Sequence, residues 1–280
     1  MPALLVGCDF SSAPTRRKNI VVATGGVVGA DVRLQAVHRF HSLDAWSDWL
    51  GSQPAWVGAF DLPFGLPREL IESLQWPLDW RASIAHFAGI DRVELRRRLT
   101  AFCAARPAGG KFAHRATDGP AGSSPSMKWV NPPVAWMLHA GVPRLLATGA
   151  HFPAHLPPPQ SEPARVALEG YPGLVARDVL GRTSYKSDAA TRQDEGRREA
   201  RECLLRALEA GQTRLGLSLA VGGAHRAELV ADGSADTLDA VLCLMQAAWA
   251  ARRADSPGRG YGVPPGVDPL EGWIVGATPP

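Results

Sequence analysis

An apolar run that ends at an acidic residue occurs three times in this chain, and this pattern constrains the fold more than any other feature. The runs lie at residues 3–10, 55–60 and 165–168, and their acids are Asp9, Asp61 and Glu169. Each run is typical of a short buried strand, and a carboxylate there is costly to bury unless it is paired or binds a cation. A turn cap formed with Ser11 or Ser12 would explain Asp9 alone. The repetition favours a shared site.

The segments between the first two acids predict how their strands are related. Residues 19–24 are rich in β-branched side chains, and residues 32–40 alternate apolar with polar ones, as half-exposed antiparallel strands do. We therefore expect three antiparallel strands in succession, followed by a helix that begins after Ser42. A strand reached through a helix is expected to pair parallel to the first strand, because parallel pairing needs such a crossover. Asp61 should then emerge at the same sheet edge as Asp9.

The last strong helix, expected from residue 235 to about 253, carries two further acids near its start. Asp236 and Asp239 are three positions apart and so share one helix face. Acids near a helix N-terminus also complement the helix dipole, which is the alternative explanation for this pair. Clustered carboxylates repel one another, and oxygen-only ligands suit Mg²⁺ or Mn²⁺. Two such ions about 4 Å apart can activate water and stabilise the leaving oxygen in phosphodiester cleavage.

Short motifs in a fixed order extend over nearly the whole chain. They are Val6-Gly7-Cys8-Asp9-Phe10-Ser11-Ser12-Ala13-Pro14, Phe60-Asp61-Leu62-Pro63-Phe64-Gly65-Leu66-Pro67, Glu169-Gly170-Tyr171-Pro172, Asp236-Thr237-Leu238-Asp239-Ala240 and Glu271-Gly272-Trp273-Ile274. Together they resemble the motif series of the DUF429 family of predicted RNase H-like nucleases. The Asp-x-x-Asp-Ala pair also resembles that of RuvC-type resolvases, in which the residue before Ala is a principal metal ligand. By that resemblance Asp239 is the better ligand and Asp236 its helper.

The resemblance implies an α/β fold built on an RNase H-like mixed five-stranded sheet. Three antiparallel strands would be followed by two parallel ones, with helices on the flanks. We expect a single domain over residues 1–280, with a largely helical insertion at about 75–162 and a last strand or edge segment at 271–276. Our interpretation is a metal-dependent nuclease in which Asp9 bridges two ions. Asp61, Glu169 and Asp239 would complete the metal ligands.

Basic residues in and after the insertion are candidates for binding a nucleic acid. Residues 92–118 are rich in Arg and Lys, which suits phosphates, although a charge run is more often a solvated helix face. Lys186, which follows Tyr185, is a candidate for contacting the scissile phosphate, and a solvated loop residue is the alternative. The candidate substrate-binding residues are Ser11, Ser12, Arg97, Lys111, His114 and Arg115.

Composition limits the class of protein. The chain of 280 residues is 45% hydrophobic and 20% charged, which is ordinary for a globular protein, and its net charge of +3 does not by itself indicate nucleic acid. The four cysteines are scattered, which predicts reduced thiols in a cytoplasmic protein. We expect no signal peptide, because Asp9 interrupts the apolar start, and no membrane span, because no apolar run is long enough.

Two other classes of function remain open. The chain can be a binding module that holds nucleic acid or a protein partner without cutting it, and loss of an expected acid would favour that. It can also be an ATP-using enzyme of the actin-like class, whose core is related. That class normally has two such domains and glycine-rich phosphate loops, which this sequence lacks. The sequence does not indicate DNA or RNA, the polarity of cleavage or the oligomeric state.

Overall fold

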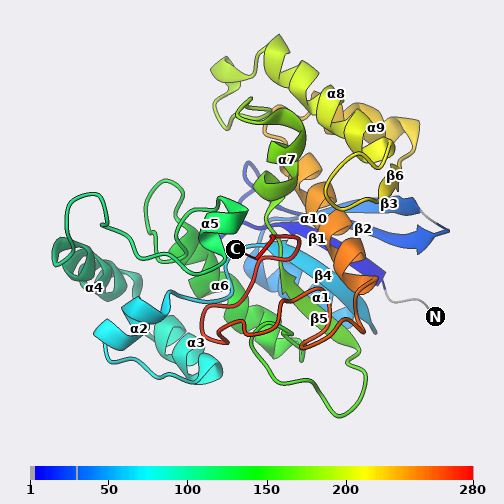
Figure 1. Ribbon diagram of the computed structural model, residues 1–280. Helices are drawn as coiled ribbons and strands as arrows, with labels where there is room; N and C mark the ends of the chain where they lie inside the picture. Colours follow the sequence, from blue (N-terminus) through cyan, green and yellow to red (C-terminus); the bar gives the residue numbers. More distant parts are fainter. Residues whose placement is uncertain (1–3, 30, 280) are drawn as a thin grey trace.

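A computed structural model describes residues 4–29 and 31–279, and its centre is a mixed six-stranded sheet in the order β5-β4-β1-β2-β3-β6 (Figure 1). The strands are β1 (Leu4–Asp9), β2 (Ile20–Val28), β3 (Asp31–Phe40), β4 (Trp56–Asp61), β5 (Arg165–Glu169) and β6 (Ser218–Ala220). Strands β1, β2 and β3 are antiparallel in succession, whereas β4 is parallel to β1 and β5 is parallel to β4. This arrangement is consistent with an RNase H-like core.

The structure confirms the expected strand directions and adds one strand. Helix α1 (Leu43–Ser52) joins β3 to β4, and the Ser42 hydroxyl caps it by accepting from the Ala45 amide at 3.2 Å. The five strands expected from the sequence are present, but β6 pairs parallel with β3 as a sixth. This strand was missed because its three residues form no apolar run of their own. Ala3, which the sequence places in the first strand, lies outside the described residues.

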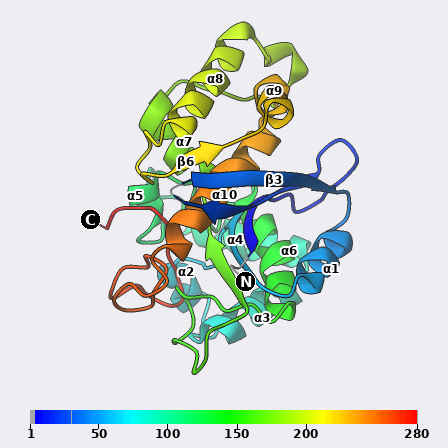
Figure 2. The same cartoon turned by 90° about the vertical axis from the view of Figure 1, so that its right-hand side faces the viewer.

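Helices cover both faces of the sheet. One face carries α10 (Asp236–Ala251), with α7 (Pro172–Leu180), α8 (Glu195–Glu209) and α9 (Gly223–Ala231) beyond it (Figure 2). The other face carries α1, α3 (Trp80–Gly89) and α6 (Val134–Ala147). The remaining helices are α2 (Arg68–Ser73), α4 (Arg92–Ala104), α5 (Asp118–Ala121) and the short 3₁₀ helix η1 (Ala190–Arg192). None of the helices in the described part of the chain is long and apolar enough to cross a membrane.

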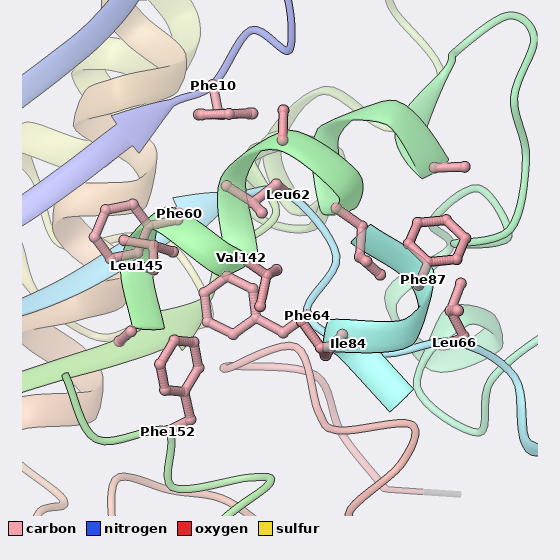
Figure 3. Close-up of a cluster of buried hydrophobic side chains, with 14 of the residues drawn as sticks. Phe10, Phe60, Leu62, Phe64, Leu66, Ile84, Phe87, Val142, Leu145 and Phe152 are labelled. Carbon is pink, nitrogen blue, oxygen red and sulfur yellow. The ribbon is translucent and has the colours of Figure 1, made fainter. Parts of the chain in front are cut away.

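The predicted insertion packs against the sheet through a shared hydrophobic cluster. Phe60 of β4 belongs to the same cluster as Phe87 of α3 and Val142 of α6. Figure 3 shows these side chains in one cluster with Phe64 and Phe152. Residues 271–276 form no strand; they contribute an isolated bridge between Ile274 and Glu169.

Glycine at position 7 sets the distance between α10 and β1. A Cβ atom there would lie 2.1 Å from both the Ala240 carbonyl oxygen and the Leu244 amide nitrogen. The neighbouring atoms are backbone, so they cannot rotate away. The glycine therefore lets the helix lie directly on the strand, and the start of α10 comes to the end of β1.

We expect Gly7→Ala to destabilise the fold by at least about 2 kcal/mol, because overpacking would push α10 off β1. Gly51→Ala is the matched control: Gly51 lies in α1 and a Cβ there would meet no atom within 4 Å. The control should be neutral or more stable by up to about 1 kcal/mol. Urea unfolding of both variants measures the difference, and equal midpoints would contradict the close packing.

Candidate active site

Asp9 and Asp61 are adjacent on the sheet. They are paired residues at the C-terminal ends of the parallel strands β1 and β4. Because side chains alternate between the two faces of a sheet, Asp9 lies on the same face as Gly7, the face that α10 covers. Asp9 is only 7% exposed. Parallel pairing thus brings two acids that are far apart in the sequence to one edge, under one helix.

Helix α10 places a third acid beside this pair. Asp239 lies in the first turn of α10 and is fully buried. The turn before the helix is fixed by Asp232, whose carboxylate accepts from the amide and the hydroxyl of Thr237 at 3.1 and 3.0 Å. The charge of Asp239 raises the pKa of both Asp9 and Asp61. The three carboxylates therefore form one electrostatic cluster, called the acidic cluster below.

Two lysines supply positive charge to the acidic cluster. Lys186 Nζ donates to Asp239, and the hydroxyl of Tyr185 donates to the other carboxylate oxygen of Asp239 at 2.6 Å. Lys18 Nζ lies 2.9 Å from an oxygen of Asp236. The chain has four lysines, so half of them contact the acids of α10.

Asp9 and Asp61 have no such partners. Within residues 4–29 and 31–279, neither carboxylate accepts a hydrogen bond or forms an ion pair, and the alternative interpretation of Asp9 as a turn cap with Ser11 or Ser12 is not supported. Burial raises the pKa of Asp9 well above its usual range, and the charges of Asp239, Asp236 and Asp61 add to this effect. Burial also raises the pKa of Asp61 to about 7, although Lys186 opposes the shift. Two unpartnered acids therefore lie at the edge of the sheet.

Glu169 occupies a different position from the one the sequence suggested. It pairs with Phe60, so it starts on the opposite face of the sheet from Asp9 and Asp61. Both of its oxygens accept from Arg115, at 2.6 and 2.8 Å, and the Phe64 amide donates at 2.9 Å. In this arrangement Arg115 contacts both oxygens of Glu169, so a metal ion there would have to compete with the ion pair. The apolar run did not reveal this, because the face of its last residue depends on the register of β5.

Arg115 is a correction to the predicted substrate-binding set. The sequence places it in a polar loop, but the structure buries it to 3% exposure between Glu169 and Asp118. Its guanidinium therefore ties the insertion to the end of β5, and Arg115 lines a cavity together with Asp61 and Glu169. Lys111 and His114, from the same loop, are exposed.

The basic patch on α4 is largely neutralised by its own helix. Arg97 and Arg98 both pair with Glu94, at 2.6 and 2.7 Å. These pairs are on the surface, where ion pairs are worth little, and they match the solvated-face alternative. Helix α4 also lies at the outer end of the insertion, away from α10 (Figure 1). The hydroxyls of Ser11 and Ser12 follow Asp9 and are half-buried, and the Ser12 carbonyl accepts from Arg92 at 3.4 Å.

Lys18 was missed by sequence reasoning. It stands in the turn after β1, 218 positions from Asp236, and only the folded chain shows the contact. A weak signal was present, since a lysine is unusual in a chain whose basic residues are nearly all arginine. Lys18 also pairs with Asp188 at 3.0 Å and so joins the segment after β1 to the segment that carries Lys186.

The donors at the acidic cluster suit a hard divalent cation, but they are not arranged around one. In the described part of the chain, no group of three or more His, Cys, Asp or Glu side chains is placed to hold a metal ion. Lys186 already contacts Asp239. A cation would therefore need a change of side-chain conformation at Lys186. Comparison with models of known protein families, with curated proteins and with solved structures found no match.

The raised pKa of Asp61 predicts a pH dependence of stability. Its folded pKa of about 7 lies above the ordinary value of 3.8, so its contribution is fully present below about pH 4 and is lost as the pH rises through 7. In EDTA, we expect Asp61→Asn to gain stability relative to the wild type between pH 4 and pH 8, by up to about 4 kcal/mol. Exposed Asp48→Asn should show no such gain. Urea unfolding across this pH range measures both; parallel curves would rule out a buried, shifted Asp61.

Breaking the Arg115 network tests its structural role. Arg115→Met should destabilise the fold by about 3–5 kcal/mol, because it leaves Glu169 buried without its partner. Arg97→Met on the surface should change stability by less than about 0.5 kcal/mol. Thermal or urea unfolding decides the point. A mild effect of Arg115→Met would mean that Glu169 is free to take another role.

Proposed function

We propose that this protein is a divalent-metal-dependent nuclease with an RNase H-like fold, which hydrolyses phosphodiester bonds of nucleic acid. The observation that carries the proposal is the unpartnered pair Asp9 and Asp61, in register on neighbouring parallel strands and beside Asp239. Asp9 is buried and Asp61 is half-buried, and removing an unpaired carboxylate from water is costly unless a cation compensates it. The motif series that resembles the DUF429 family supports the same function.

Asp9, Asp61 and Asp239 are the residues that would hold Mg²⁺ or Mn²⁺. All three offer carboxylate oxygens, which these ions prefer. When bound, such an ion lowers the pKa of a coordinated water and stabilises charge on the phosphate oxygens. Glu169 keeps Arg115 in place, and both residues line a cavity that Asp61 also lines. Asp236 holds Lys18 at the rim.

Lys186 and Tyr185 also have roles in this proposal. Lys186 balances the charge of Asp239 in the state described here. Its ammonium group lines the same cleft as Asp61, so it can contact a phosphate oxygen of a substrate there. Tyr185 keeps the second oxygen of Asp239 oriented through its 2.6 Å hydrogen bond. In the proposed enzyme, Tyr185 would hold Asp239 in place, and Lys186 would move from Asp239 to a phosphate oxygen of the substrate.

The proposal predicts a specific response to metal in thermal melts. Mn²⁺ at about 100 times its Kd should stabilise the wild type by about 2.7 kcal/mol. Asp9→Asn should abolish most of this gain. In EDTA this variant should melt at the same temperature or higher, because the change removes like-charge repulsion.

Asp48→Asn serves as the control for a lost surface charge, and it should respond to Mn²⁺ as the wild type does. Cleavage of a nucleic acid should require Mg²⁺ or Mn²⁺ and should be lost in Asp9→Asn. An Asp9→Asn variant that is less stable in EDTA, together with a wild type that ignores Mn²⁺, would refute the metal site.

A second candidate function is a binding module that holds nucleic acid without cutting it. One observation favours it: Lys186 occupies Asp239, and no metal-ready group of side chains is present in the described residues. The two functions differ in a simple readout. A binding module would hold nucleic acid equally well in EDTA and in Mn²⁺, and would leave it intact in both.

A further inference from the structure

A cleft of about 390 Å³ lies beside the acidic cluster, between the start of α7 and residues 181–186. We call it the α7 cleft. Asp61 and Lys186 line it and connect it to the acidic cluster, and Arg182, Thr183 and Ser184 form part of its wall. A ligand in this cleft would therefore reach the acids that the proposed function assigns to metal binding.

The α7 cleft contains one unpaired cation among the described residues, Arg182. Arg182 is exposed and, within the described residues, has neither a hydrogen bond nor an ion pair. The other arginine that lines the cleft, Arg177, already has partners: it donates to the Ala121 carbonyl and packs over the Tyr171 ring at 5.2 Å. Arg182 is thus available to an anion. Thr183 and Ser184 add exposed hydroxyls next to it.

The start of α7 adds backbone dipoles to the same wall. This helix has nine residues, begins with Pro172 and has no side-chain cap. The positive end of the helix dipole therefore lies at the cleft, which Asp61 also lines. Gly173 lets the Tyr171 ring pack against this end of the helix, since a Cβ there would lie 2.8 Å from the ring. The start of α7, Arg182 and Lys186 all line the α7 cleft. Of the two cations, Lys186 is paired with Asp239, whereas Arg182 has no partner among the described residues.

The size of the α7 cleft limits what can enter it. A volume of about 390 Å³ is at the small end of the range for small-molecule sites, roughly 300–1,000 Å³. A single nucleotide fits a space of this size, whereas a whole base pair does not. The wall combines apolar surface at Pro172 and Ala176 with the charged Arg182 and Lys186, so it suits a ligand that has a less polar body and an anionic group.

We propose that the α7 cleft binds the phosphate and sugar of one unpaired nucleotide, with the phosphate between Arg182 and Lys186 and the adjoining phosphodiester next to Asp61. This inference rests on the proposed function and adds a substrate class to it: a strand that is single-stranded at the site. The cationic wall holds the strand in place while the acidic cluster faces the bond to be cut.

The test measures anion binding without metal, so that it does not depend on catalysis. Adenosine 5′-monophosphate and a fluorescent single-stranded oligodeoxynucleotide are titrated into the full-length protein in EDTA, and the same strand annealed to its complement is the third probe. Arg182→Glu should weaken the two unpaired probes by at least about tenfold, since it replaces a charge-assisted contact by repulsion. Arg182→Lys should restore much of the binding.

Arg192→Glu is the matched control. Arg192 is exposed in η1, on the same segment, but does not line the α7 cleft. It removes the same net charge, so equal losses in Arg182→Glu and Arg192→Glu would reduce the effect to general electrostatics and overturn the subsite. Binding of the oligodeoxynucleotide without binding of the monophosphate would also overturn it. Duplex that binds as tightly as the single strand, with the same dependence on Arg182, would overturn the preference for unpaired strands.

Mn²⁺ melts separate this inference from the proposed function. Arg182→Glu should keep the metal-free melting temperature of the wild type and its full stabilisation by Mn²⁺. Arg182 is exposed, and it is not one of the proposed metal ligands. Loss of anion binding with an intact metal response supports the subsite. An intact Arg182-dependent subsite in a protein that ignores Mn²⁺ would leave the cleft standing and refute the nuclease.

Discussion

The direct packing of α10 on β1 is the contact on which the acidic cluster depends. Because position 7 has no side chain, the helix backbone reaches the strand backbone, and Asp239 is brought beside Asp9. Carboxylates repel, so this proximity must be imposed by the rest of the fold. The hydrophobic residues of α10, which are buried along its whole length, supply that force. The cluster is held together by packing and not by attraction between its members.

A second set of charged residues, at the end of β5, is held together by attraction. Glu169, Arg115 and Asp118 form a buried network that satisfies its own members and joins the insertion to β5. The two faces of the same sheet edge thus carry acids in contrasting states. On one face Asp9 and Asp61 lack partners, whereas on the other Arg115 contacts both oxygens of Glu169. The first arrangement therefore leaves more binding capacity for a ligand.

Much of the fold followed from local patterns in the sequence, and most of the misses depended on long-range register. The strand ends at Asp9 and Asp61 were predictable, because an intervening helix forces parallel pairing and parallel strands end at one edge. The face of Glu169 was not, since a shift of one residue along β5 reverses it. The burial of Arg115 could not be predicted from its polar loop, because it depends on an ion pair with Glu169, which is distant in the sequence. Lys18 could be linked to Asp236 only by the tertiary structure.

Lys18 and Lys186 lie on largely irregular surface segments, while the acids that they meet belong to α10 in the core. Segments of this kind open locally far more readily than strands or buried helices. An opening of residues 181–194 would carry Lys186 away from Asp239, while an opening of the turn after β1 would remove Lys18 from Asp236. Loss of either contact would leave more net negative charge at the end of the sheet. The electrostatics of the buried acids therefore depend on two lysines that lie outside the core.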